Sequence, residues 1–208
     1  PLYNWEYHRQ TGYAWWMKRM AYSFKLYDQV RVDHFRGFDQ YFSIPAGAEN
    51  AVGGHWEQGP GIELFRRVKE ALGDKEIIAE DLGYVTDSVR RLVAETGYPG
   101  MKVLEFAFDS REPSNYLPHR YIRNCICYSG THDNETLAQW LAQTSETARA
   151  YAAEYLGLTE QEGYAWGILR SGLASVADTF IAQLQDYLGL GAEARMNLYK
   201  CGDKLSHP

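Results

Sequence analysis

Three stretches of this sequence end an apolar run with a carboxylate. They read VRVDHFRGF at 30–38, KEIIAEDLG at 75–83 and CICYSGTHDN at 125–134, and the carboxylates are Asp33, Glu80 and Asp133. An apolar run that breaks into a polar loop is typical of a buried parallel strand, and α/β proteins bind ligands at the carboxyl ends of such strands. If the three strands are parallel and adjacent, the three carboxylates lie at one rim, where a (β/α) barrel carries its active site.

Cleavage of a glycosidic bond is the first reaction that carboxylates at such a rim could catalyse. It needs a nucleophilic carboxylate, a second carboxyl whose pKa is raised so that it can protonate the leaving oxygen, and charge support for the transition state. Arg31 lies two residues before Asp33 on the same strand face and would hold that carboxylate ionised and oriented. His34 and His132 could bind sugar hydroxyls. For a retaining enzyme we expect the carboxyls of Asp33 and Glu80 about 5–5.5 Å apart.

Two other interpretations use the same residues. The pairs Asp33-His34, Glu80-Asp81 and His132-Asp133 could be ligands of a divalent metal in a barrel hydrolase. Alternatively, Asp81, Asp133 and Asn134 only cap the following helices and Asp33 only pairs with an arginine. Each motif taken alone fits a purely structural role, as a helix cap or an ion pair, as well as it fits catalysis. The repetition of the pattern at three strand ends favours a functional site.

Composition narrows the class of ligand. The 208 residues are 45% hydrophobic and 23% charged, which predicts a globular chain with one sizeable core. A net charge of −6 without a basic stripe argues against nucleic-acid binding. The aromatic content of 14%, with 16 Tyr and 6 Trp, suits a flat, hydroxyl-rich ligand.

The sequence also indicates the cellular compartment of the protein and its relation to a longer chain. No apolar run near 18 residues and no signal peptide is present, so nothing in the sequence indicates a membrane or secretion. Cys125, Cys127 and Cys201 lack the spacing of a disulfide framework or a metal site and are expected to be buried thiols in a reducing cytoplasm. Because the chain opens at Pro1 without a methionine, we interpret it as a piece of a longer protein.

Strand and helix patterns alternate along the chain, which predicts an α/β fold with a parallel sheet. The long segment from Phe38 to Gly61 is rich in glycine and proline and is expected to be an irregular loop that covers the substrate. Five strands are too few to close an eight-stranded barrel. The expected strands are 28–33, 75–80, 101–109, 124–129 and 176–184, and the expected helices are 12–28, 61–72, 86–97, 137–156 and 159–174.

The motifs VRVDHFRGF, IIAEDLG, GMKVLEFAFD, SGTHDNET and ARMN, in this order and at these separations, resemble the 4-α-glucanotransferases, also called amylomaltases or disproportionating enzymes. The resemblance runs from PLYNW at the start to about Asn197. It implies a (β/α)₈ barrel enzyme that cuts an α-1,4-glucan with retention and passes the fragment to another sugar. It also implies that neither a metal nor an organic cofactor takes part in that chemistry.

The resemblance assigns roles by position. Asp33 would be the nucleophile that forms the glycosyl-enzyme, Glu80 the general acid/base, and Asp133 the residue that grips sugar hydroxyls in the transition state. The residues expected to contact the reactive sugar or outer parts of the substrate are Arg31, His34, His132, Asp81, Asp109 and Asn197. Trp56, in the long loop, is added on its residue type as a ring that could stack on glucose, and a core or hinge role suits it equally well.

The resemblance is incomplete at both ends. Residues 1–197 would supply the later five strands of the barrel, and the family's earlier strands and further substrate-binding residues lie upstream of Pro1. At 198–208 the family pattern continues with Pro-Gly and a Trp-bearing tail, whereas this chain reads LYKCGDKLSHP, to which we assign no structure or function.

The sequence therefore predicts the C-terminal catalytic part of a cytoplasmic 4-α-glucanotransferase that acts on α-1,4-glucans and maltooligosaccharides. A hydrolase or branching enzyme of the same clan is the alternative among enzymes, and a glucan-binding or inert piece is the alternative of another class. The 208-residue chain alone is expected to be inactive. The sequence predicts no oligomeric state.

Overall fold

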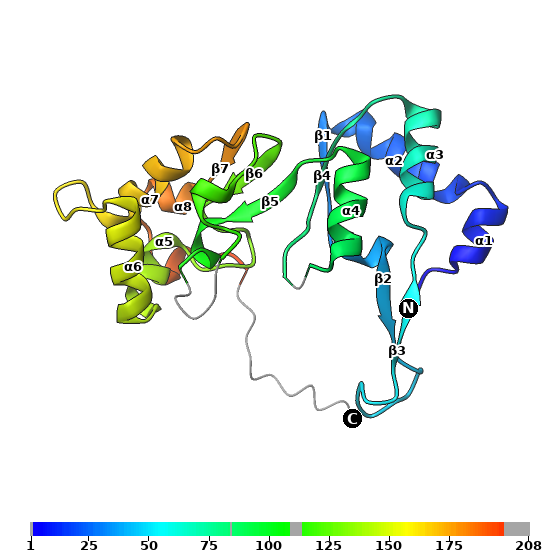
Figure 1. Cartoon of the computed structure of the whole chain (residues 1–208), viewed down its shortest axis with the longest axis horizontal. Coiled ribbons are helices and arrows are strands. Elements are labelled where there is room, and N and C mark those ends of the chain that lie inside the picture. Colours follow the sequence, from blue (N-terminus) through cyan, green and yellow to red (C-terminus); the bar gives the residue numbers. More distant parts are fainter. Residues whose placement is uncertain (1, 84, 109–113, 198–208) are drawn as a thin grey trace. The chain divides into compact units, whose positions relative to one another are not determined.

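The computed structural model describes residues 2–83, 85–108 and 114–197, and the chain forms two compact units that meet in sequence between Met101 and Lys102 (Figure 1). Strands and helices are mixed in both units, which confirms the α/β class. The strands are β1 (Gln29–Val32), β2 (Gln40–Ser43), β3 (His55–Gln58), β4 (Glu76–Ala79), β5 (Gly100–Val103), β6 (Cys125–Tyr128) and β7 (Thr179–Ile181). The α-helices are α1 (Trp5–Gln10), α2 (Ala14–Leu26), α3 (Ile62–Leu72), α4 (Asp87–Thr96), α5 (Leu137–Gln143), α6 (Glu146–Leu156), α7 (Tyr164–Leu173) and α8 (Leu184–Tyr187).

The first unit is built on the parallel pair β1 and β4. Their register runs from Gln29 opposite Glu76 to Val32 opposite Ala79. Helix α3 begins after Gly61 and ends at Gly73, and it buries Leu64, Phe65 and Val68, as its apolar spacing predicts. Helix α4 has the expected cap at Thr86, whose hydroxyl accepts a hydrogen bond from the amide of Val89 at 3.4 Å, and ends at Gly97 in the left-handed conformation.

Aromatic rings form the core of this unit beneath the end of β1. Phe35 is fully buried, and its ring stacks on that of Phe65 with the centroids 4.8 Å apart. Phe38 packs edge-on against the same ring at 5.2 Å. Both phenylalanines belong to a 3₁₀ turn at Phe35–Phe38. The segment that follows Asp33 is therefore anchored by large buried side chains.

The second unit contains a sheet in the order β5-β6-β7, with β6 and β7 parallel and Ile126 opposite Thr179. Helices α5, α6 and α7 pack against it (Figure 1). Leu104, Leu137, Ile168 and Leu169 are among the most deeply buried side chains of this core. Cys125 and Cys127 are buried and belong to no disulfide, as expected, and Cys201 lies outside the described residues.

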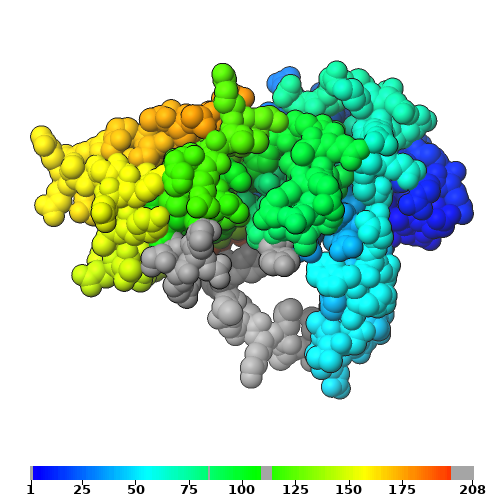
Figure 2. Space-filling model, in the orientation of Figure 1, coloured from blue at the N-terminus to red at the C-terminus, as the bar shows by residue number. Residues whose placement is uncertain are grey.

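The prediction of an irregular loop at 38–61 is wrong in part, because β2 and β3 form an antiparallel hairpin there. The register pairs Gln40 with Gln58 and Ser43 with His55, and the Tyr41 hydroxyl donates a hydrogen bond to Glu57 at 2.8 Å. The hairpin stands off from the rest of its unit (Figures 1 and 2). The two strands are only four residues long and are separated by a glycine-containing segment. The alternation of apolar and polar residues in them is too short to be recognised in the sequence.

Several boundaries also differ from the predicted ones. The ring-rich start holds helix α1, and the strand expected at 101–109 ends at Val103, where a 3₁₀ turn begins. The helix expected at 137–156 is two helices, because Ser145 caps α6 by accepting a hydrogen bond from Ala148 N at 3.1 Å. Thr159 caps only a turn, and α7 starts later, after Gly163 with φ of 85°. The last strand covers only Thr179–Ile181.

No helix in the described part of the chain is long and apolar enough to span a membrane.

Candidate active site

Asp33 and Glu80 are the first residues beyond a matched pair of parallel strands. The last paired residues of β1 and β4 are Val32 and Ala79. The amide of Glu80 donates to the carbonyl of Val32 at 3.0 Å, and the amide of Phe35 donates to the carbonyl of Glu80 at 2.9 Å. The backbone hydrogen bonds thus continue past the strands and fix both carboxylates at the carboxyl end of the pair.

Arg31 contacts Asp33 as its spacing predicts. Its Nη2 donates to Asp33 Oδ1 at 2.7 Å, while 75% of the Asp33 side chain remains exposed. A charge-assisted hydrogen bond of this length orients a carboxylate. The other Asp33 oxygen is thus free of this contact.

Glu80 has different surroundings. One carboxylate oxygen accepts the amide of His34 at 2.6 Å and the other accepts the amide of Leu82 at 3.0 Å. The pKa of Glu80 is raised, mainly because burial disfavours the charged form and further because of the negative charge of Asp33; the two amides and Arg31 oppose the rise. A carboxyl that keeps its proton to higher pH is suited to donate it.

His34 adopts a backbone conformation that its sequence does not signal. Its φ of 47° and ψ of 53° place it in the left-handed region, which is uncommon for a residue other than glycine. This conformation accompanies the hydrogen bond from its amide to Glu80. Gly37 lies against the ring, since a Cβ there would be 3.1 Å from His34 Cδ2. Strain of this kind is found at functional sites and costs about 1–3 kcal/mol.

In the second unit the structure brings His132, Asp133 and Asn197 together. Asn197 Nδ2 donates to Asp133 Oδ1 at 2.8 Å, and His132 Nε2 lies 3.3 Å from Asp133 Oδ2. Arg195 donates to the backbone carbonyl of Asp133 at 2.7 Å. The helix cap that follows is Thr136 and not Asp133, so the capping alternative is wrong for this carboxylate. The contact of Arg195 was missed, although this residue is part of the ARMN motif.

The remaining predicted residues are Asp81, Trp56 and Asp109. The carboxylate of Asp81 accepts the amide of Met101 at 2.7 Å and does not cap α4. Trp56 is half exposed on β3, with the Arg36 guanidinium 4.7 Å from the ring centroid. Asp109 lies outside the described residues. Within those residues no group of three or more His, Cys, Asp or Glu side chains is placed to hold a metal ion.

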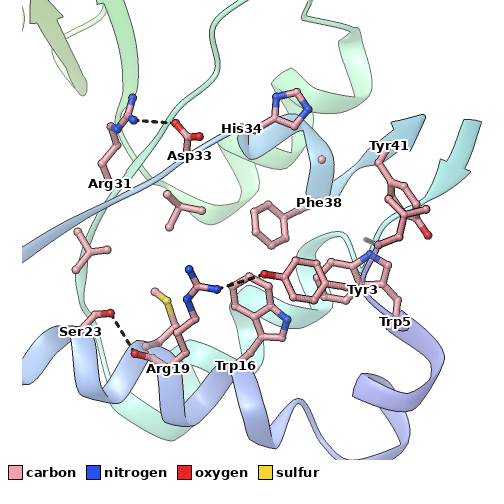
Figure 3. A pocket seen from close by; sticks show the side chains of 15 residues that line it. Tyr3, Trp5, Trp16, Arg19, Ser23, Arg31, Asp33, His34, Phe38 and Tyr41 are labelled. Carbon is pink, nitrogen blue, oxygen red and sulfur yellow. Dashed lines mark hydrogen bonds and ion pairs between the residues drawn. The ribbon is translucent and has the colours of Figure 1, made fainter. Parts of the chain in front are cut away.

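A cavity of about 400 Å³ in the first unit reaches Asp33. Figure 3 shows the Arg31–Asp33 pair and His34 at one side of it and a group of rings at the other. The rings are those of Tyr3, Trp5, Trp16, Phe38 and Tyr41. The cavity therefore has a charged edge and a largely apolar body.

A family model described as 4-alpha-glucanotransferase matches residues 1–201 of the chain. The chain belongs to the 4-α-glucanotransferase family. The resemblance carried by the motifs is thereby confirmed.

Among curated members of the 4-α-glucanotransferase family, the protein of Clostridium butyricum is 48% identical over 198 residues, a match that covers 95% of this chain and 41% of the relative. The protein of Thermus thermophilus is 41% identical over 204 residues and has the same coverage. The chain thus spans about two fifths of the length of these relatives.

Solved structures give the same result. The amylomaltase of Streptococcus agalactiae, solved with acarbose, matches with a TM-score of 0.90 and 43% identity over 95% of this chain and 40% of that one. The amylomaltase of Corynebacterium glutamicum matches with a TM-score of 0.65 over 84% of this chain and 30% of that one. At 19% identity, this second likeness concerns the fold alone.

Proposed function

We propose that the protein containing this chain is a 4-α-glucanotransferase, which moves a segment of an α-1,4-glucan onto an acceptor sugar by a retaining double displacement. The observation that carries the proposal is the pairing of Asp33 and Glu80 at the end of β1 and β4. One carboxylate is exposed and held by Arg31, whereas the other is partly buried with a raised pKa. Two carboxyls with different environments are what an acid/base and a nucleophile require.

In the first step, an oxygen of Asp33 bonds to C1 of the donor sugar while the bond between C1 and the glycosidic oxygen breaks. Glu80 gives its proton to that leaving oxygen. In the second step, the acceptor hydroxyl returns a proton to Glu80 and its oxygen displaces Asp33 from C1. The glycosidic bond is re-formed without net consumption of water, and no metal or cofactor is required.

The other predicted residues bind substrate in this proposal. Asp133, held by Asn197, would accept hydrogen bonds from sugar hydroxyls, which His132, His34 and Arg31 would also contact. Asp81 and Asp109 would contact outer parts of the glucan. Trp56, whose ring is half exposed on the hairpin, is suited to stack on a glucose unit.

We further infer that β1, β4, β5, β6 and β7 are the later five parallel strands of a (β/α)₈ barrel, within a catalytic part that spans 1–197. The parallel pairs β1-β4 and β6-β7 support this, as does the hydrogen bond from Ala79 N to Pro99 O at 2.9 Å just before β5. The likeness to the Streptococcus agalactiae amylomaltase supports it as well. The structure has seven strands in its described residues, and we assign five of them to the barrel because β2 and β3 form a separate hairpin. We keep cytoplasm as the expected compartment.

The products formed from maltotriose test the proposed activity. The full-length protein is incubated with maltotriose alone, and products are separated by chromatography. Transfer yields maltooligosaccharides both longer and shorter than the substrate. Glucose and maltose alone would instead identify a hydrolase, and unchanged maltotriose would identify a non-catalytic protein.

A further inference from the structure

The loop that carries Asp133, residues 129–137, rests on an unusual concentration of buried polar side chains. Six polar or charged side chains are buried among the residues that the structure describes, and five of them belong to this loop or lie beneath it: Glu105, Ser129, Thr131, Thr136 and Asp186. Burying polar groups costs free energy unless they are hydrogen-bonded. The carboxylate of Glu105 has no hydrogen-bond partner among the described residues, whereas the other four side chains are hydrogen-bonded and constrain the loop.

Asp186 joins the two ends of the Asp133 loop. Its Oδ2 accepts the hydroxyl of Ser129 at 2.6 Å, and its Oδ1 accepts the amide of Leu137 at 2.7 Å. Ser129 directly follows β6, and Leu137 is the first residue of α5. With 2% of its surface exposed, Asp186 is too deep to contact a sugar.

Gln183 holds the middle of the same loop. Its Nε2 donates to the carbonyls of Thr131 at 3.1 Å and Glu135 at 2.9 Å, one on each side of Asp133. Within the loop, Asn134 Oδ1 accepts the amide and the hydroxyl of Thr131 at 2.9 and 2.8 Å. Asp133 is thus the exposed apex of a loop that is fixed from below at both ends and in the middle.

We propose that Asp186 and Gln183 are positioning residues that hold the Asp133 loop, and through it the carboxylate of Asp133, in the geometry needed to bind sugar hydroxyls in the transition state. The catalytic part of this inference rests on the proposed function. The structural part, that these two side chains fix residues 129–137, stands on the hydrogen bonds alone.

Four variants separate this role from general stability. Asp186→Ala removes both acceptors and leaves the hydroxyl of Ser129 and the amide of Leu137 without them, whereas Asp186→Asn keeps an oxygen for the amide and offers an NH₂ to the hydroxyl. Gln183→Leu removes both donated bonds at similar volume. Asp178→Asn is the control, because Asp178 is on the surface in an ion pair with Arg123.

Hydrogen exchange of peptides that cover 129–137 in the full-length protein is the first measurement. Exchange there should rise at least about 10-fold in Asp186→Ala and Gln183→Leu, and it should stay near wild type in Asp186→Asn and Asp178→Asn. Unchanged exchange in a folded Asp186→Ala or Gln183→Leu protein would overturn the proposal. If Asp186→Ala does not fold, the milder Gln183→Leu variant decides by the same criterion.

Steady-state kinetics of maltotriose transfer is the second measurement. A displacement of about 1 Å can cost on the order of 100-fold in rate, so kcat should fall by about that factor in Asp186→Ala and Gln183→Leu while KM changes little. Asp186→Asn should restore most of kcat. Faster exchange with unchanged kcat would refute the positioning role. If the wild-type protein performs no transfer, the proposed function fails, but the exchange measurement still tests whether the two side chains hold the loop.

Discussion

Asp33 and Glu80 occupy equivalent positions at the ends of neighbouring strands, yet their side chains meet different surroundings. Asp33 is exposed and paired with a guanidinium, whereas Glu80 is partly buried and accepts two backbone amides. Burial and the charge of Asp33 both disfavour ionisation of Glu80. This difference supports the proposed roles of Asp33 as nucleophile and Glu80 as acid, since the residue types alone are nearly equivalent.

Replacing the nucleophile tests this assignment. Asp33→Asn in the full-length protein should lower the rate of glucan transfer by at least about 10³-fold, because no carboxylate remains to bond to C1. Mass spectrometry with a slowly turned-over fluorinated donor should find a glycosyl-enzyme in the wild type and none in the variant. Asp74→Asn is the control, since Asp74 is exposed and forms a surface ion pair with Lys69. A covalent adduct that persists in Asp33→Asn would assign the nucleophile elsewhere.

The acid role of Glu80 predicts a dependence on the leaving group. Glu80→Gln should slow cleavage of natural maltooligosaccharides by about 10²–10⁴-fold but slow formation of the glycosyl-enzyme much less with an aryl donor, whose leaving oxygen needs little protonation. In the wild type, the raised pKa of Glu80 keeps this acid protonated to higher pH. The activity should therefore fall at a higher pH than it would with a glutamate of ordinary pKa. Equal losses on both donors, measured by pre-steady-state kinetics, would count against the acid role.

At the scale of elements, the sequence predicted those features that depend on local signals. Helices α3 and α4 were placed to within about one residue because Gly61, Gly73, Thr86 and Gly97 mark their ends. The strand ends with Asp33 and Glu80 followed from apolar runs that stop at a charge. The hairpin, the left-handed His34 and the hydrogen bonds of Gln183 were missed because they depend on contacts between residues distant in sequence or on backbone angles that composition does not encode.

The structure of the hairpin explains why residue 59 is a glycine. A Cβ on Gly59 would lie 2.3 Å from the carbonyl oxygen of Phe38, and a backbone atom cannot move aside as a side chain can. We expect Gly59→Ala to destabilise the first unit by about 1–3 kcal/mol. Urea denaturation followed by tryptophan fluorescence measures this. Gly53→Ala is the matched control, because a Cβ there meets nothing within 4 Å, and an equal loss in both variants would contradict the steric argument.

Glu105 should make the stability of the second unit depend on pH. It is buried, and neither carboxylate oxygen has a hydrogen-bond partner among the residues that the structure describes. Its pKa is raised from 4.5 to about 9, first by burial and then by the charges of Asp186 and Glu135, with Arg195 opposing. Between these two values the folded unit retains a proton that the unfolded chain has released. The contribution of Glu105 to the stability of the folded unit is therefore fully present below about pH 4.5. It decreases as the pH rises toward 9, by up to about 1.4 kcal/mol per pH unit.

The variant Glu105→Gln cannot ionise and should lose this part of the pH dependence. Urea unfolding at pH 6, 7 and 8, followed by a probe in the second unit, should show a smaller decline in stability for Glu105→Gln than for wild type. Glu154→Gln is the control, since Glu154 is exposed on α6. Parallel slopes for all three proteins would mean that Glu105 is already ionised in the folded unit.

At the scale of the whole molecule, the proposed reaction depends on groups in both compact units. Asp33 and Glu80 belong to the first unit, and Asp133 with its supports belongs to the second. In the proposed function all three carboxylates act on one sugar, so the reaction requires residues of both units. The relatives are longer than this chain, which spans about two fifths of their length.

The last prediction follows from this requirement: the 208-residue chain expressed alone should not disproportionate maltotriose. In the described residues β1 is hydrogen-bonded only to β4, so its other edge is open, and an open edge with exposed apolar side chains favours aggregation. Lost burial at about 25 cal/mol per Å² easily reaches several kcal/mol, comparable with the roughly 5–15 kcal/mol that stabilises a domain. The full-length protein and a full-length relative serve as positive controls. A soluble monomer of this chain that converts maltotriose to longer and shorter oligomers would show that the residues present here suffice to hold the three carboxylates in place.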